Sequence, residues 1–237
     1  MKSHLFQFLA LISPALGITV TPGGTDYAAI KNAITAFALK DSRLVSSNSS
    51  LVAPTKRRAA DPVSVWSTVG TFIDGPAGLA TGVILTTGQA ASAAPGVAAD
   101  GSWGYGQDRM TLCPVAPSKE YSMFRLKISA PPGVNGLRVN YLFAEDGRMF
   151  QLDAAQVLLS GTTPVPESVV IAKRDPRMKP GVPGANLGLS YEITTGVFSF
   201  HIPLESGAQD LTFMVCDRGD SAGDSAVLLN IEGVSSW

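Results

Sequence analysis

The residues of this chain best suited to chemistry form an acidic stretch near the C-terminus. Three carboxylates, Asp217, Asp220 and Asp224, fall within eight residues. Apolar runs at 211–215 and 227–231 flank them, so the pattern predicts two strands joined by an acidic, glycine-bearing loop. Clustered carboxylate oxygens are ligands that calcium prefers, but this spacing is not the alternate-residue spacing of an EF-hand. The alternative is a solvated turn whose aspartates cap backbone N–H groups.

A second acidic pair, Glu145 and Asp146, ends another predicted strand. A loop geometry different from the EF-hand would bring this pair together with the aspartates of the acidic loop. We therefore expect a single acidic edge, which is a candidate calcium site. Its candidate ligands are Glu145, Asp146, Asp217, Asp220 and Asp224.

The same loop contains Gly219-x-Ser221-x-Gly223, a spacing that resembles the nucleophile elbow of serine hydrolases. Such a serine needs an acid and then a histidine downstream, and no histidine follows Ser221. The chain has two histidines, His4 and His201, and the second lies in a predicted strand twenty residues before Ser221. We therefore reject a serine hydrolase and expect no zinc site. A glycosidase needs only two carboxylates and stays open as an alternative.

Charge and short motifs narrow the range of partners. The formal net charge is −1, only 16% of residues are charged, and no lysine-rich block occurs. Binding to nucleic acid through phosphate neutralisation is therefore not expected. Arg218-Gly219-Asp220 resembles an adhesion tripeptide, but such short patterns often arise by chance, and Arg218 can simply neutralise its acidic neighbours.

The N-terminus has the pattern of a secretory signal peptide over residues 1–17. Lys2 supplies the positive charge, residues 5–16 the apolar region, and Ala15-Leu16-Gly17 a small-x-small cleavage site. This apolar run is too short to span a bilayer, and no later segment approaches the length of a transmembrane helix. We expect a protein without a membrane span that is secreted, extracellular or cell-wall associated.

Three further features fit an exported protein. Cys113 and Cys216 are the only cysteines, and in an oxidising compartment we expect them to form one disulfide instead of remaining two buried thiols. Asn48-Ser49-Ser50 is a glycosylation sequon. Lys56-Arg57-Arg58 is either a site for a dibasic processing protease or an exposed cluster of solvated charges, and we favour the second interpretation.

The remaining pattern predicts an all-β fold with one short N-terminal helix. Asp26 is a candidate N-cap, and the apolar residues Ala29, Ile30, Ala33, Ile34 and Phe37 recur at helical spacing. The serine-rich segment 42–50 predicts a loop that leads into or out of a short strand. Strands are expected at 65–73, 79–86, 121–129, 137–144, 157–160, 168–172, 189–193, 197–203, 211–215 and 226–231.

About ten short strands separated by turn signals favour an antiparallel two-sheet β-sandwich, jelly-roll-like in its connections. Alternating βα units are missing from the pattern, which argues against a doubly wound sheet. We expect one domain over residues 18–237, with the helix-containing segment 18–62 packed on it or linked to it.

Three segments resemble, in order along the chain, motifs of the choice-of-anchor L domain. Residues 82–88 read Gly-Val-Ile-Leu-Thr-Thr-Gly, similar to a Gly-(Val/Ile)-(Ile/Val)-Leu-Ser-(Thr/Ser)-Gly element. Residues 140–146 read Asn-Tyr-Leu-Phe-Ala-Glu-Asp, similar to a Tyr-Val-Phe-Ala-Ser-Glu-Glu strand end. Residues 217–227 resemble a C-terminal signature in which Asp-x-Gly-Asp runs into Tyr-Asp-Ser-Ala-Val, with Gly223 at the tyrosine position.

This resemblance implies a β-sandwich module of secreted or surface-attached proteins with no established catalytic activity. We therefore expect a non-catalytic extracellular module for binding, adhesion or matrix association, with an extracellular protein or glycan surface as its partner. Two alternatives remain: a secreted glycan hydrolase that uses paired carboxylates, and a small secreted effector that binds a host protein.

Overall fold

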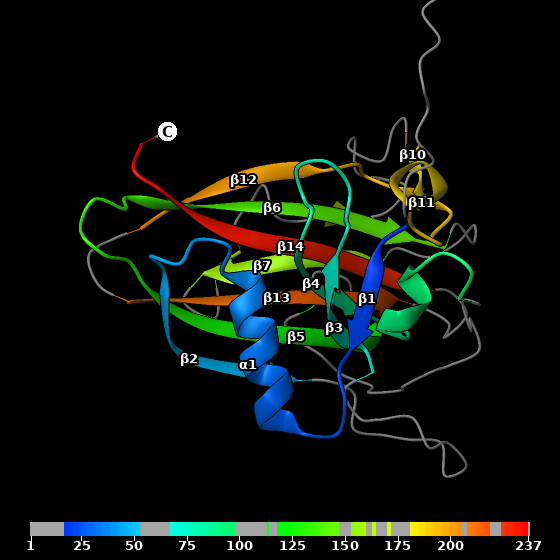
Figure 1. The fold of residues 1–237 in the computed structure, drawn as a ribbon, viewed down its shortest axis with the longest axis horizontal. Helices are drawn as coiled ribbons and strands as arrows, with labels where there is room; N and C mark the ends of the chain where they lie inside the picture. The colour runs from blue at the N-terminus through cyan, green and yellow to red at the C-terminus, as the bar shows by residue number, and fades with distance from the viewer. Residues whose placement is uncertain are drawn as a thin grey trace, which may run out of the picture.

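The protein folds into two antiparallel β-sheets that pack face to face, with one α-helix beside them (Figure 1). This confirms the predicted all-β, two-sheet sandwich. The computed structural model describes residues 17–52, 67–97, 113, 118–146, 153–159, 163–164, 170–171, 181–204, 208–218 and 224–236. Within these ranges no helix has the length and apolar character needed to cross a membrane.

The large sheet has eight strands in the order β1-β3-β4-β14-β6-β11-β10, and β12 also pairs with β6. Its strands are β1 (Thr19–Pro22), β3 (Val69–Ile73), β4 (Gly82–Thr86), β6 (Gly136–Glu145), β10 (Val182–Pro183), β11 (Ile193–Thr194), β12 (Phe198–Pro203) and β14 (Ser225–Val234).

The small sheet has six strands in the order β2-β5-β13-β7-β8, and β9 also pairs with β7. Its strands are β2 (Val45–Val52), β5 (Ser118–Ser129), β7 (Ala154–Leu159), β8 (Thr163–Pro164), β9 (Val170–Ile171) and β13 (Ala208–Arg218).

Side chains alternate across each strand, and the inward set builds the main core between the sheets. Phe213 on β13 and Phe124 on β5 stack with ring centroids 6.3 Å apart, and Leu229 of β14 belongs to the same cluster. Two smaller apolar clusters use the outward sets. One, with Ile84 and Leu228, lies on the outer face of the large sheet, and the other, with Met214, on that of the small sheet.

The helix α1 (Tyr27–Ala38) forms where the sequence predicts it and connects the two sheets. The Asp26 carboxylate caps it by accepting hydrogen bonds from the backbone N–H groups of Ala28 and Ala29, at 2.9 and 3.1 Å. Its buried residues Ile30, Ile34 and Ala38 join the main core, and the helix contacts β2 of the small sheet as well as β3, β4 and β14 of the large one.

The prediction for the apolar stripe of this helix was partly wrong. Phe37 is 37% exposed, and Ala29 and Ala33 are exposed as well. The buried face follows a strict four-residue spacing at Ile30, Ile34 and Ala38, because the helix packs along a narrow seam between two sheets instead of lying flat on one.

Two predictions of strand bounds were also wrong. The serine-rich segment 42–50, expected as a loop next to a short strand, lies within strand β2 from Val45 on, because its backbone pairs with β5 and Leu51 fills the core. In the segment 189–193, Leu189 and Tyr191 are buried in a non-strand connection after the 3₁₀ turn Gly184–Leu187, and pairing with β6 begins only at Ile193.

Candidate functional site

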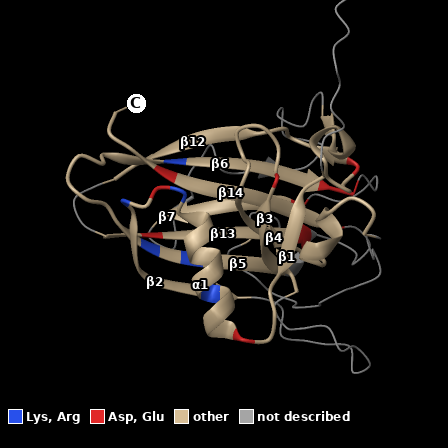
Figure 2. Cartoon of the chain, viewed as in Figure 1, with Lys and Arg blue, Asp and Glu red and all other residues tan. Residues whose placement is uncertain are grey.

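Five acidic residues collect where β6 ends, β14 begins and β13 ends; we call this the acidic end (Figure 2). Ser225, the first residue of β14, is paired in register with Glu145, the last residue of β6. One residue further, the Asp146 backbone N–H donates to the Asp224 carbonyl oxygen at 3.1 Å. The acidic end comprises Glu145, Asp146, Asp153, Asp217 and Asp224.

Strand alternation divides the acidic end into an inner set, which faces the space between the two sheets, and an outer set on the outer face of the large sheet. Glu145 shares a face with Phe143 of the main core, so its position faces the space between the sheets. By the same alternation, Asp217 and Asp153 occupy inward positions of the small sheet. Asp146 and Asp224 take the parity of Ala144 and Ala226, which lie in the cluster on the outer face of the large sheet.

The inner set is buried and polar. Glu145, Asp153 and Asp217 are 4%, 1% and 0% exposed. The Ser225 hydroxyl donates a hydrogen bond to Oδ2 of Asp153, which connects β14 in the large sheet to the start of β7 in the small one. Asp217 and Asp153 are each one residue beyond the last register pair of the β13–β7 ladder.

Neutral polar groups complete the lining of this region. The backbone N–H of Ser225 donates to the Thr87 hydroxyl at 2.9 Å, and the backbone N–H of Thr87 donates to the Ser225 carbonyl at 2.9 Å. Between the sheets, the Ser122 hydroxyl donates to the Thr86 carbonyl at 2.7 Å. At this end, the interior of the sandwich is therefore lined by carboxylates and hydroxyls, whereas its middle is apolar.

The outer set centres on Asp224, which is 4% exposed and lies directly over Gly88. A Cβ atom at Gly88 would lie 2.1 Å from Cγ of Asp224, so only glycine permits this approach. Tyr191 is the nearby phenol. Its burial raises the pKa of the hydroxyl well above the usual value, and the negative charges of Asp224 and Asp146 raise it further.

A disulfide fixes the strand that carries Asp217. Cys216 and Cys113 are bonded with an S–S distance of 2.00 Å, as the sequence predicted. Both belong to the cluster on the outer face of the small sheet, next to Met214 and Tyr121. The end of strand β13 is therefore covalently bonded to a segment about a hundred residues earlier in the chain.

The described acidic residues do not form a calcium site by themselves. Among the residues that the structure describes, no three histidine, cysteine, aspartate or glutamate side chains are placed to hold one metal ion. Asp220, a predicted ligand, lies outside the described residues, as does the Gly219-x-Ser221-x-Gly223 motif. Carboxylate chemistry fits calcium, but any such site would need oxygen atoms beyond the described acidic groups.

The one histidine among the described residues lies far from the acidic end. His201 is exposed on β12, paired in register with Arg138 of β6. Glu145 is seven residues further along β6 than Arg138. At about 3.3 Å per residue, this separates His201 from the acidic end by about 23 Å.

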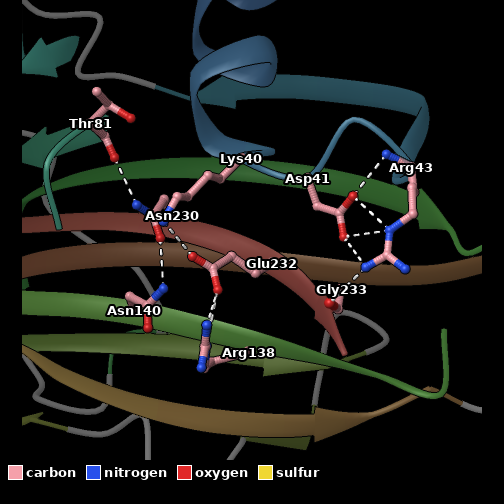
Figure 3. Close-up of polar contacts among 9 residues, drawn as sticks. All are labelled: Lys40, Asp41, Arg43, Thr81, Arg138, Asn140, Asn230, Glu232 and Gly233. Atoms are coloured by element: carbon pink, nitrogen blue, oxygen red, sulfur yellow. Dashed lines mark hydrogen bonds and ion pairs between the residues drawn. The ribbon is translucent and has the colours of Figure 1, made fainter. Parts of the chain in front are cut away.

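The opposite end of the same two strands carries ion pairs instead of buried acids (Figure 3). Glu232 of β14 accepts from the Lys40 ammonium at 2.7 Å and from the Arg138 guanidinium of β6. Asp41 pairs with Arg43 at 2.6 Å, and the same guanidinium donates to the Gly233 carbonyl at 3.2 Å. These contacts attach the segment after α1 to the large sheet.

A polar pair lies next to these ions within the large sheet (Figure 3). The Asn140 side-chain amide donates to Oδ1 of Asn230 at 2.9 Å, and the Asn230 amide donates to the Thr81 carbonyl at 2.7 Å. These bonds connect β6, β14 and the start of β4.

Sequence reasoning missed Asp153 and Thr87 at the acidic end. Asp153 directly precedes the mostly apolar strand β7, and that position was the signal that could have found it. Asn48 of the sequon is exposed on β2, whereas Lys56-Arg57-Arg58 and residues 1–16 of the leader lie outside the described ranges. No protein-family model matches the chain, and no curated protein matches it significantly.

Proposed function

We propose that this protein is a secreted, non-catalytic extracellular module for binding, adhesion or matrix association, whose partner is an extracellular protein or glycan surface. One observation carries the proposal: the acidic residues flanking the 219–223 connection are part of the scaffold. Asp217 and Asp224 are buried at strand ends, and Ser225 is hydrogen-bonded across the two sheets. Binding loops are commonly held by rigid strand ends of this kind.

The arrangement of the three family-like segments supports a choice-of-anchor L-like module. They belong to β4, β6 and the β13–β14 region, and β4, β14 and β6 are neighbours in the large sheet. The glycines that bracket the first segment both approach β14 or the residue before it. A Cβ at Gly88 would collide with Asp224 of the last segment, and one at Gly82 would lie 2.2 Å from the carbonyl oxygen of Leu229, two residues beyond that segment. Motifs far apart in sequence thus form one contact unit.

Secretion is supported by the position of Ile18, next to the predicted cleavage site, and by the disulfide. Cleavage after Gly17 would leave Ile18 first, and Ile18 is 2% exposed with its N–H donating to the Gly188 carbonyl at 3.1 Å. The predicted leader would thus be removed without loss of a core residue. A disulfide between Cys113 and Cys216 fits an oxidising compartment.

Burial also distinguishes a binding module from a glycan hydrolase. A glycosidase needs two carboxyl groups that reach the scissile bond, and Glu145, Asp153 and Asp217 face the interior between the sheets.

The decisive assay incubates the mature protein with a panel of immobilised and soluble glycans and matrix proteins. We expect saturable retention on a surface and no release of sugar. Sugar release that collapses in Asp153→Asn, with the fold intact, would replace the proposal by a hydrolase.

Calcium is part of the proposal as a stabiliser of the acidic end. Burying several carboxylates is unfavourable unless hydrogen bonds, cations or a metal ion balance their charges. Asp224 and Asp146, which share the outer face of the large sheet, would contribute together with Asp220, four residues before Asp224. When bound, the ion would supply positive charge and hold the ends of β6 and β14 together.

A thermal melt with calcium and then with excess chelator tests this part. A ligand at a hundred times its Kd stabilises the native state by about 2.7 kcal/mol, which corresponds to a rise in Tm of roughly 5–10 °C for a chain of this size. The shift should disappear in Asp224→Asn and persist in Asp210→Asn, a matched change at an exposed position of β13. No shift at millimolar calcium would mean that hydrogen bonds and basic groups hold the acidic end.

A further inference from the structure

The strand β2 is the longest edge strand of the described sheets, and its own sequence gives it little protection. Residues 45–52 read Val-Ser-Ser-Asn-Ser-Ser-Leu-Val, with no charged residue and no proline. Exposed edges of this kind pair readily with other chains, and natural proteins usually protect them with charges, prolines, bulges or covering groups. Val45 is 59% exposed at the start of this strand.

Two protective features are already visible along β2. The register with β5 shifts between Ser46 and Asn48, so Ser47 is an extra residue that interrupts the edge. Further along, the Leu51 backbone N–H donates to the Tyr27 hydroxyl at 3.3 Å, which occupies a donor that a neighbouring strand would otherwise use. Between the bulge at Ser47 and the bond at Leu51, Asn48 is exposed.

Asn48 and Ser50 point to the same side of β2, the outer face of the small sheet. Asn48 is paired with Lys127 and Ser50 with Arg125, and those two basic residues lie on the outward side of β5. Ser49 points the other way, where its hydroxyl accepts from the Thr35 hydroxyl of α1 at 2.9 Å. The sequon's acceptor amide and the hydroxyl two residues later are therefore both on the accessible face.

A polar groove of about 370 Å³ runs from Asn48 across this face. Its lining includes Lys127, Arg125, Asp210 and Thr212, which follow Asn48 and Ser50 across β5 and β13 in register. Charged and hydroxyl groups on a shallow sheet surface suit the hydroxyl and acetamido groups of sugars, which need hydrogen-bond donors and acceptors. The groove begins at the one asparagine of the chain that lies in a sequon.

We infer that Asn48 carries an N-linked glycan whose first sugars lie over this groove and whose bulk hinders another chain from reaching the edge of β2. In the transfer, a bond forms from Nδ2 of Asn48 to the anomeric carbon of the first N-acetylglucosamine. The bond from that carbon to the pyrophosphate of a lipid-linked oligosaccharide donor breaks, and the amide loses one proton. The inference rests on the secretion part of the proposed function, because this transfer takes place in the secretory pathway.

Intact mass of the full chain secreted from a eukaryotic host tests the modification. We expect one glycan, removed by an endoglycosidase, and its loss in Ser50→Ala but not in Ser49→Ala, which keeps the sequon. Secreted protein at its unmodified polypeptide mass would overturn the inference while leaving the proposed function standing. Protein that stays inside the cell with its leader attached would instead contradict the secretion on which both depend.

Aggregation below the unfolding temperature tests the protective role. The glycosylated protein should stay monomeric, and Asn48→Gln should aggregate several-fold faster with little change in Tm. Asn48→Lys should restore resistance, because a charge on an edge strand opposes pairing as a glycan does. Equal aggregation rates for wild type and Asn48→Gln would overturn this role.

Discussion

Carboxylates lie in opposite environments at the two ends of β6 and β14. At one end, Glu232 meets Lys40 and Arg138, whose side chains are 53% and 44% exposed. At the other, Glu145 lies opposite Ser225 in the same ladder and is almost completely buried, together with Asp153 and Asp217 from the small sheet. The same pair of strands therefore ends in an ion-pair network with exposed basic groups around the partly buried Glu232 on one side, and in a buried acidic region on the other.

This difference indicates different roles. Exposed ion pairs contribute little to stability, because water screens them and long side chains lose entropy when they are held. Buried carboxylates depend strongly on every group around them, because an uncompensated charge in the interior is very unfavourable. We therefore expect changes at the acidic end to have large effects on stability, and changes at the ion-pair end to have small ones.

The largest effect should follow loss of the disulfide that ties β13 at the acidic end. The bond joins residues 103 positions apart, and closing a loop of that length stabilises the folded state by about 4–5 kcal/mol in the chain-entropy model. Changing both Cys113 and Cys216 to alanine should lower the unfolding free energy by that amount in a urea titration. A loss under about 1 kcal/mol, in a variant that keeps the same m-value, would show that the bond does not constrain the unfolded chain as this model requires.

An intermediate effect is expected for Gly88→Ala. The added Cβ would lie 2.1 Å from Cγ of Asp224, so Asp224 must move away from its buried position, at a typical overpacking penalty of about 1–3 kcal/mol. Gly24→Ala is the matched control, because its Cβ would meet nothing within 4 Å. Equal melting temperatures for the two variants would mean that Asp224 shifts freely and that the acidic end is less rigid than its burial suggests.

Much of the fold could be predicted from the sequence because local signals agree with tertiary structure there. Apolar alternation gave the central strands β5, β6, β13 and β14, and Asp26 marked the start of the helix. The strand β2 could not be found this way. Serine is a poor strand former, and its strand conformation depends on pairing with β5, which is distant in sequence.

The acidic end was predictable only in part for a related reason. The sequence placed Glu145 and Asp224 at strand ends, and the register of β6 with β14 brings those ends together. Whether a residue faces the interior depends on strand parity relative to the core, which becomes certain only once the sheets are assembled. Asp153 joins the region through the opposite sheet, so no local pattern indicated that Ser225 would bind it.

The smallest effect belongs to the ion-pair end. Burial alone would raise the pKa of Glu232, but hydrogen bonds from Lys40 and Arg138 outweigh it and hold that pKa below its usual value. The Arg43 side chain likewise lowers the pKa of Asp41 to about 2. Because these pKa values are lower in the folded state, their contribution is complete at neutral pH and is lost as the pH falls through the folded values.

Glu232→Gln should therefore cost about 0.5–1 kcal/mol at neutral pH and low salt. Glu192→Gln, at an exposed position, is the control and should cost less. Urea titrations along a pH series should show the difference between wild type and Glu232→Gln shrinking in acid, where the carboxyl is protonated, and in 1 M salt, where the pair is screened. A difference that stayed constant under both conditions would assign Glu232 a packing role. The two ends would then differ only in the burial of their carboxylates and not in the contribution of charge pairing to stability.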